Sequence, residues 1–210
     1  MGEKMRKRLL LITLSLLFVL VSQFTISFPA HATQPFKPGK YEELMLAVDQ
    51  EGNLEGYYNE SQGEGIVKTC TFFFKGKAAD SRADITAWND QSVPGVLKAE
   101  AKGVNLRIEH GRDFPGCSMV LMPEIAQGIS LDKTMEAAWN TLDVVDSERA
   151  YLYSAPVDDK KLKTYLIKND VAGVLAKQGD WVKIEFPREG KKSVTGWVKA
   201  VDVKELAALK

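Results

Sequence analysis

The sequence predicts a mainly all-β protein, in which a small antiparallel β-barrel or sheet domain precedes a smaller C-terminal domain. Three observations support this prediction: short runs of alternating apolar and polar residues along most of the chain, glycine and proline between these runs, and a single candidate helix. The 210 residues are 45% hydrophobic and 27% charged, which suffices for one large domain or two small ones and argues against a disordered chain.

Residues 1–32 have the pattern of a signal peptide. Four basic residues between Lys4 and Arg8 precede an apolar run from Leu9 to Val21, and the small residues Ala30 and Ala32 mark a cleavage site after Ala32. An uncleaved anchor is the alternative, although polar residues interrupt the apolar run beyond Val21. We therefore expect a periplasmic or secreted protein without a stable membrane anchor after cleavage.

Charge differs between the two predicted domains. Residues 33–146 contain 11 basic and 18 acidic residues, a net charge of −7, whereas residues 147–210 contain 13 and 9, a net charge of +4. The whole chain has 28 of each sign, so it lacks the bulk positive charge of a nucleic-acid-binding protein. The asymmetry is consistent with two domains that face different partners, although an acidic solvated surface is the commoner explanation.

Strand patterns fill residues 38 to about 125. The segments 41–49 and 54–59 flank a turn-forming cluster and predict a hairpin. Further strands are predicted over 66–74, 83–88, 96–101, 104–109 and 118–122. In the first of these, period-2 alternation places Cys70, Phe72 and Phe74 on one face, with Phe73 on the other. We expect these strands to form one antiparallel sheet or barrel.

The two cysteines predict a disulfide. Cys70 and Cys117 are an even pair in an exported protein, so only one intramolecular bridge is possible. The alternative is a nucleophilic cysteine activated by His110, as in wall-peptide hydrolases, but a bridged thiol cannot attack. We expect no cofactor and no metal site, because the acidic residues between Asp80 and Asp90 lack the spacing of a calcium loop.

The segment from Ser130 to Thr141 is the one predicted helix. Its apolar residues recur at helical spacings, and Trp139 among them is predicted to be a core residue. We expect this helix at the junction between the domains.

The last 60 residues resemble a bacterial SH3-like domain. Four segments carry the resemblance in order and spacing: Ala150-Tyr-Leu-Tyr-Ser-Ala-Pro156, Tyr165-Leu-Ile-Lys-Asn-Asp170, Gly179-Asp-Trp-Val-Lys-Ile184 and Gly196-Trp-Val-Lys-Ala-Val-Asp202. The resemblance implies a small five-stranded barrel that binds peptides, often those of the cell wall, and is not catalytic. The chain lacks the acidic loop pattern of eukaryotic members, so the resemblance does not imply a proline-rich ligand.

Four aromatic residues in this region are candidate ligand-binding residues. Alternation along the strands places Tyr151, Tyr153, Trp181 and Trp197 opposite the aliphatic side chains, on the polar face. Aromatic rings on a polar face are typical of a peptide-binding groove. For Trp197, packing at the rim of the barrel is an equally good interpretation.

These observations favour a non-catalytic binding protein of the cell envelope, whose SH3-like domain binds wall peptide or a protein partner. The alternative is an inhibitor or immunity protein that neutralises a secreted or wall-degrading enzyme through its acidic domain. The N-terminal domain loosely resembles such small exported barrels in size, strand density and its single predicted disulfide, without a diagnostic motif. An enzyme is disfavoured because the sequence contains no phosphate-binding loop, metal cluster or clear nucleophile-base pair.

Overall fold

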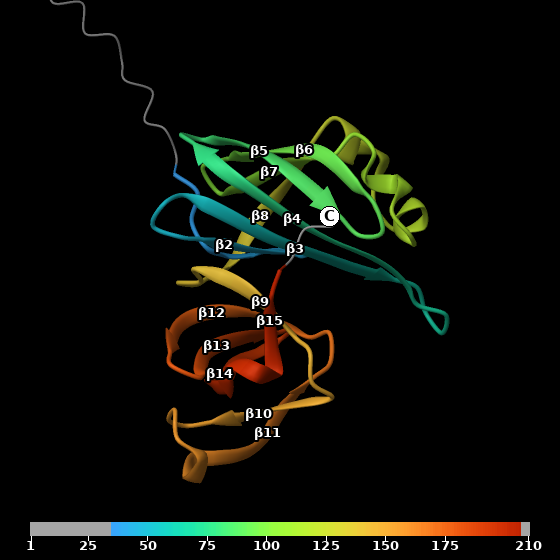
Figure 1. Cartoon of the computed structure of the whole chain (residues 1–210). Helices are drawn as coiled ribbons and strands as arrows, with labels where there is room; N and C mark the ends of the chain where they lie inside the picture. Colours follow the sequence, from blue (N-terminus) through green and yellow to red (C-terminus); the bar gives the residue numbers. More distant parts are fainter. Residues whose placement is uncertain (1–34, 207–210) are drawn as a thin grey trace, which may run out of the picture. The chain divides into compact units, whose positions relative to one another are not determined.

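The first half of the chain forms a closed barrel in which each strand pairs antiparallel with the next and the last pairs with the first (Figure 1). The computed structural model describes residues 35–206, so the predicted signal peptide and its cleavage site lie outside the described residues. The eight barrel strands are β1 (Gly39–Tyr41), β2 (Leu44–Val48), β3 (Asn53–Gln62), β4 (Lys68–Ala79), β5 (Arg82–Trp88), β6 (Ser92–Ala99), β7 (Gly103–Arg107) and β8 (Ile129–Glu136). No helix within the described residues is long and apolar enough to cross a membrane.

Apolar side chains fill the inside of the barrel. Cys70, Phe72 and Phe74 are fully buried and point inward from β4, as their alternation predicts. The Phe72 ring stacks on Tyr58 of β3, with 4.8 Å between the ring centroids. Gly56 on β3 leaves room for the Phe74 ring, because a Cβ atom there would lie 2.1 Å from it. The barrel is therefore a packed core.

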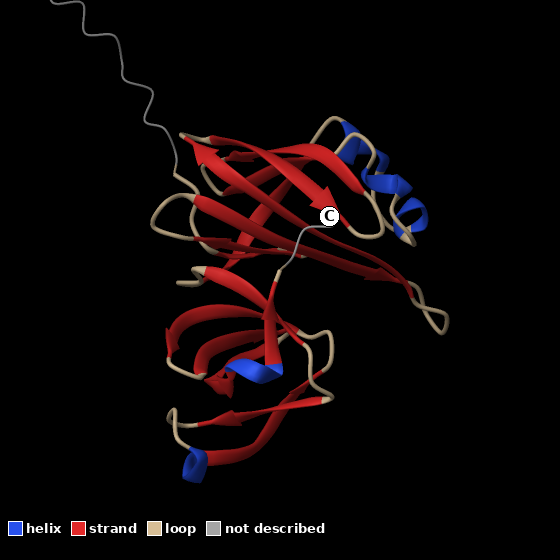
Figure 2. Ribbon diagram, in the orientation of Figure 1, coloured by secondary structure: helices blue, strands red, loops and turns tan. Residues whose placement is uncertain are grey.

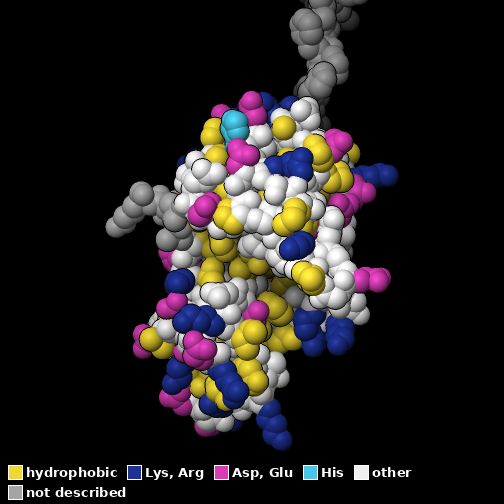
Figure 3. Space-filling model, turned by 90° about the vertical axis from the view of Figure 1, so that its right-hand side faces the viewer, with side chains coloured by type: hydrophobic (Ala, Val, Ile, Leu, Met, Phe, Trp, Pro, Cys, Tyr) yellow, Lys and Arg dark blue, Asp and Glu magenta, His cyan; other side chains and the backbone are white. Residues whose placement is uncertain are grey.

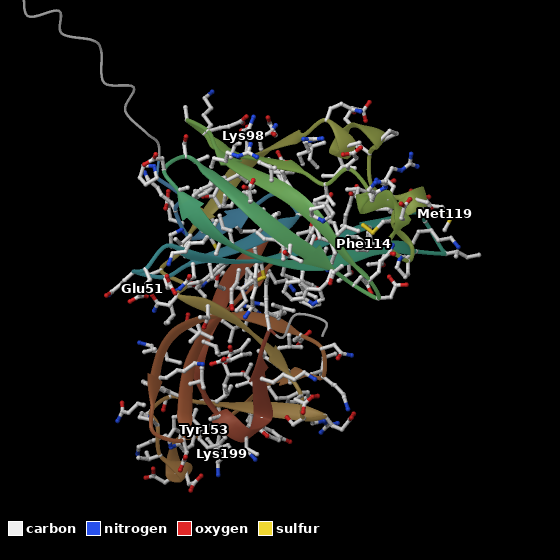
Figure 4. The ribbon with its side chains drawn as sticks, turned by 45° about the horizontal axis from the view of Figure 1, so that its top comes forward. Glu51, Lys98, Phe114, Met119, Tyr153 and Lys199 are labelled. Carbon is white, nitrogen blue, oxygen red and sulfur yellow. A yellow bond between two sulfur atoms is a disulfide. The ribbon has the colours of Figure 1, made fainter. Side chains whose placement is uncertain are left out.

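Three short 3₁₀ helices close one end of the barrel (Figure 2). They are η1 (Gly111–Asp113), η2 (Cys117–Met119) and η3 (Pro123–Ala126). The predicted strand over residues 118–122 is therefore wrong. Pro115 and Pro123 bracket this region and a disulfide attaches Cys117 to Cys70, so its apolar residues are buried as a compact plug and not as a strand. Figure 4 shows the disulfide close to Phe114.

The predicted helix over residues 130–141 is also wrong, because most of this segment is β8, the strand that closes the barrel. β8 pairs with β7 on one side and with β1 on the other. Along β8, buried and exposed residues alternate from Ile129 to Asp132, which is strand periodicity. The four-residue spacing from Leu131 to Met135 fits both helical and strand periods, so it could not distinguish them.

The second half of the chain forms a curled seven-stranded antiparallel sheet. Its strands are β9 (Thr141–Val145), β10 (Arg149–Tyr153), β11 (Lys161–Ile167), β12 (Val171–Gln178), β13 (Trp181–Arg188), β14 (Lys191–Lys199) and β15 (Val203–Glu205), in the order β11-β10-β14-β13-β12-β9-β15. Two short 3₁₀ helices, η4 (Asp158–Lys160) and η5 (Ala200–Asp202), lie between strands. The fold is therefore all-β, as predicted.

The second sheet begins one strand earlier than the predicted boundary at Asp146. β9 lies between β12 and β15 and pairs with both. A fragment of residues 147–210 would therefore lack β9, and the edges of β12 and β15 that pair with it would be left without a partner. Residues 137–140 form the connection between the barrel and the sheet.

Candidate functional site

The candidate residues on β10, β13 and β14 lie on one face of the second sheet. Tyr153 is the cross-strand partner of Trp197, and Trp181 is the partner of Lys199. The neighbouring residues Leu152 and Val198 point to the opposite, buried face. This arrangement follows from strand alternation, because cross-strand partners share a face.

Tyr153 is not available as an exposed binding residue. Its side chain is 6% exposed, and the edge of the Trp181 ring packs against it with 4.7 Å between the ring centroids. The ammonium group of Lys199 lies 5.6 Å from the Trp181 ring centroid and forms an ion pair with Asp158 at 2.7 Å. Figure 4 shows Tyr153 and Lys199 close to each other. Tyr153 therefore lies on the face opposite Leu152, as alternation predicts, but its neighbours cover most of its ring.

Tyr151 lies in a row of cations and aromatic rings that is partly open to solvent. Its ring packs on Tyr165, its partner on β11, with 5.5 Å between the centroids. Lys161 lies over the Tyr151 ring at 3.5 Å, and the Arg149 guanidinium lies over the Tyr165 ring at 4.8 Å. The sequence patterns identified Tyr151 but not its three partners. Lys161 and Tyr165 are four residues apart on β11, so strand alternation alone places them on the same face. Such a surface suits a ligand that combines apolar area with carbonyl or carboxylate oxygens.

Three aromatic residues form a ladder on the outer wall of the barrel. Tyr57, Phe73 and Trp88 are cross-strand neighbours on β3, β4 and β5. The ring centroids of Tyr57 and Phe73 are 5.1 Å apart, and those of Phe73 and Trp88 are 6.0 Å apart. Sequence reasoning missed this ladder. Its signal in the sequence was Phe73, an aromatic residue that alternation places on the face of β4 away from the barrel core.

The ladder lines a hollow between the barrel and the second sheet, where apolar side chains gather (Figure 3). Two cavities of about 320 Å³ and 610 Å³ adjoin there and share Tyr57 and Asn169 as lining residues. Asn169 forms the turn between β11 and β12 with a φ of 71°, a left-handed conformation that asparagine tolerates. Ligand sites are frequent at such junctions between structural units.

A buried carboxylate joins the barrel to the second sheet. Glu55 points outward from β3, forms an ion pair with Lys75 at 2.7 Å and accepts a hydrogen bond from the backbone N–H of Leu142 at 2.7 Å. Trp139, fully buried as predicted, donates from its indole N–H to Glu185 on β13 at 3.0 Å. These contacts join the barrel to the second sheet and so position the two walls of the hollow.

Asp143, beside this junction, is a buried acid whose Oδ1 has no hydrogen-bond partner within the described residues. Burial raises its pKa from 3.8 to about 6. Between these pH values the folded protein therefore binds more protons at this site than the unfolded chain does. The free energy of unfolding consequently falls as the pH rises through about 6.

We expect Asp143→Asn to stabilise the protein at pH 8 by about 2 kcal/mol, because the amide carries no charge that burial penalises. Urea unfolding at pH 8 and pH 4 measures the effect, which should nearly vanish at pH 4. Asp146→Asn is the control: its exposed carboxylate pairs with Lys204, which lowers its pKa, so this change should slightly destabilise the protein at pH 8. If Asp143→Asn and the wild type had the same free energy of unfolding at pH 8, the prediction would be contradicted.

The thiol and histidine chemistry considered above is unavailable in this structure. Both sulfur atoms belong to the Cys70–Cys117 disulfide, so neither can act as a nucleophile. His110 is exposed, with its Nδ1 3.2 Å from Asp113. Within residues 35–206, no group of three His, Cys, Asp or Glu side chains is arranged to hold a metal ion.

Fold and surfaces together define a disulfide-bonded all-β protein with a closed barrel, a curled sheet and a hollow between them. Comparison with protein-family models, with curated proteins and with solved structures finds no match to this chain.

Proposed function

We propose that the protein is an exported, non-catalytic binding protein of the cell envelope, and that its second sheet binds wall peptide or a protein partner. The observation that carries this proposal is the row formed by Arg149, Tyr165, Tyr151 and Lys161 on β10 and β11. Aromatic rings supply flat apolar area, and the two cations can pair with the carboxylates of a peptide. The disulfide supports an oxidising compartment.

A matched pair of tyrosine variants tests this surface. Tyr151→Ala should weaken binding to purified wall material or to an envelope partner about tenfold or more with little change in stability, because Tyr151 is partly exposed. Tyr153→Ala should instead cost about 2–3 kcal/mol of stability, because that ring is buried. Co-sedimentation and thermal melting separate the two effects.

Lysine variants provide the control. Lys161→Ala should reduce binding, whereas Lys98→Ala, at an exposed position on the barrel, should not. Equal losses in both variants would show that net charge alone attracts the chain to wall material. Unchanged binding of both Tyr151→Ala and Lys161→Ala would refute this surface as the site.

The second candidate function is inhibition of a secreted or wall-degrading enzyme, and the β3–β4 hairpin favours it. This hairpin extends beyond the barrel wall (Figure 1), and its tip exposes Ile66 by 77% and Val67 by 58%. The Cys70–Cys117 disulfide braces its base. A braced apolar tip can enter the cleft of an enzyme. If the protein inhibits such an enzyme, Ile66→Ser with Val67→Ser should abolish inhibition and preserve wall binding.

A further inference from the structure

One end of the hollow combines apolar walls with an excess of carboxylates. The cavity of about 320 Å³ is lined on the apolar side by Met45, Tyr57 and Phe186, among others. Its charged lining residues are Glu43, Asp170, Glu189 and Lys40, so three carboxylates face one lysine. The cavity therefore has a negative potential next to apolar surface.

These carboxylates form no ion pair within the described residues. None of Glu43, Asp170 and Glu189 takes part in the ion pairs formed among residues 35–206. Burial raises the pKa of Asp170. The pKa of Glu43 is also raised, by partial burial and by the neighbouring carboxylates Glu60 and Glu189, although the attraction of Lys40 opposes this shift. Asp170 is held in place because its Oδ2 accepts a hydrogen bond from the backbone N–H of Ile167 at 2.9 Å. A bound cation would relieve both the repulsion and the cost of burial.

The adjoining cavity of about 610 Å³ supplies a longer apolar wall. The aromatic ladder of Tyr57, Phe73 and Trp88 lines one side, and Val144 and Leu206 are further apolar lining residues. Phe73 stacks on the buried Trp88 with 6.0 Å between the ring centroids, so the wall is preformed and requires little ordering on binding. Tyr57 lines both cavities and places the apolar wall beside the carboxylates.

We propose that this hollow binds a peptide segment in which an amine-bearing side chain, such as that of lysine, is followed or preceded by an apolar residue. The ammonium group would lie among Asp170, Glu43 and Glu189, with its aliphatic stem on Tyr57. The apolar residue would pack on the half-buried ring of Phe73, which stacks on the buried Trp88. Charge complementarity selects the amine, and the ladder selects its neighbour. This site is separate from the Tyr151 surface, so it does not depend on the proposed function.

The probe is a library of acetylated tetrapeptide amides, each with one lysine among alanine, leucine and phenylalanine, titrated into the full mature chain by calorimetry. A matched library carries acetyl-lysine in place of lysine and lacks the positive charge. We expect lysine peptides with an adjacent leucine or phenylalanine to bind at least tenfold tighter than their acetylated counterparts. Amide chemical-shift changes should centre on Tyr57, Asn59 and Asn169.

Charge-neutralising variants locate the ammonium group. Asp170→Asn retains an acceptor for the Ile167 N–H and should weaken binding of the best lysine peptide about tenfold. Glu43→Gln, at an exposed position on the rim, should weaken it about threefold. Glu51→Gln makes the same change in net charge at the exposed β2–β3 turn and should leave affinity unchanged, as should Tyr151→Ala.

Three results would overturn the proposal. The first is the absence of any binder at 1 mM, and the second is equal affinity for lysine and acetyl-lysine peptides. The third concerns the C-terminus of the chain. If a chain truncated after Leu206 bound the lysine peptides and the full chain did not, the last four residues would be assigned as the occupant of the hollow. None of these results affects wall binding through Tyr151, so a failure here is distinguishable from failure of the proposed function.

Discussion

Reduction of the Cys70–Cys117 disulfide should lower the free energy of unfolding by about 4 kcal/mol. The bridge joins residues 47 positions apart, and opening a loop of this length restores that much conformational entropy to the unfolded chain. In a protein of this size the loss corresponds to a fall of roughly 8–16 °C in melting temperature. Thermal melts of the oxidised and reduced protein, monitored by circular dichroism, measure it.

A cysteine-free variant separates the cross-link from packing. Cys70→Ala with Cys117→Ala should lose more stability than reduction alone, because both sulfur atoms are fully buried in the barrel core. Adding reductant should not change the melting temperature of this variant. If the reduced wild type melted within 2 °C of the oxidised protein, the barrel plug would be held by packing alone and the prediction would fail.

Trp139→Ala should cost a similar amount, about 4 kcal/mol. The indole is fully buried between the barrel and the second sheet, where it packs in a cluster with Met45, Trp88 and Val171. Gly173 on β12 leaves space for the ring, because a Cβ atom there would lie 2.2 Å from it. Removal of the ring would leave a cavity at the junction and an unpaired Glu185. Urea unfolding followed by circular dichroism measures the loss.

Trp139→Phe is the matched control. It keeps most of the ring and removes the N–H donor to Glu185, so it should cost about 1–2 kcal/mol. The alanine variant should also broaden the urea transition or split it in two, because Trp139 couples the barrel to the sheet. A single transition at the wild-type midpoint would contradict the role assigned to this residue.

Local patterns predicted most of the barrel, because antiparallel neighbours in sequence are neighbours in space. The hairpin over residues 41–59 is confirmed by the pairing of β2 with β3. The inward face of β4 is confirmed by the burial of Cys70 and Phe72. The disulfide was predictable because two cysteines allow a single pairing.

The incorrect predictions concern segments whose structure depends on distant partners. β8 closes the barrel by pairing with β1, more than 90 residues away in the chain, and its ambiguous periodicity could not reveal that partner. The segment 118–122 is a plug and not a strand because Cys117 is tied to β4. Tyr153 is buried because Trp181 covers it from another strand.

The hollow shows the same division between sequence and tertiary structure. Strand alternation determined that Phe73 points away from the barrel core, and composition determined that the two halves differ in charge. Only the tertiary structure decided that Tyr57, Phe73 and Trp88 stack and that Asp170 lines the same cavity as Tyr57. The physical reason is that alternation sets the direction of a side chain within its own strand, whereas register and packing between distant strands set its neighbours.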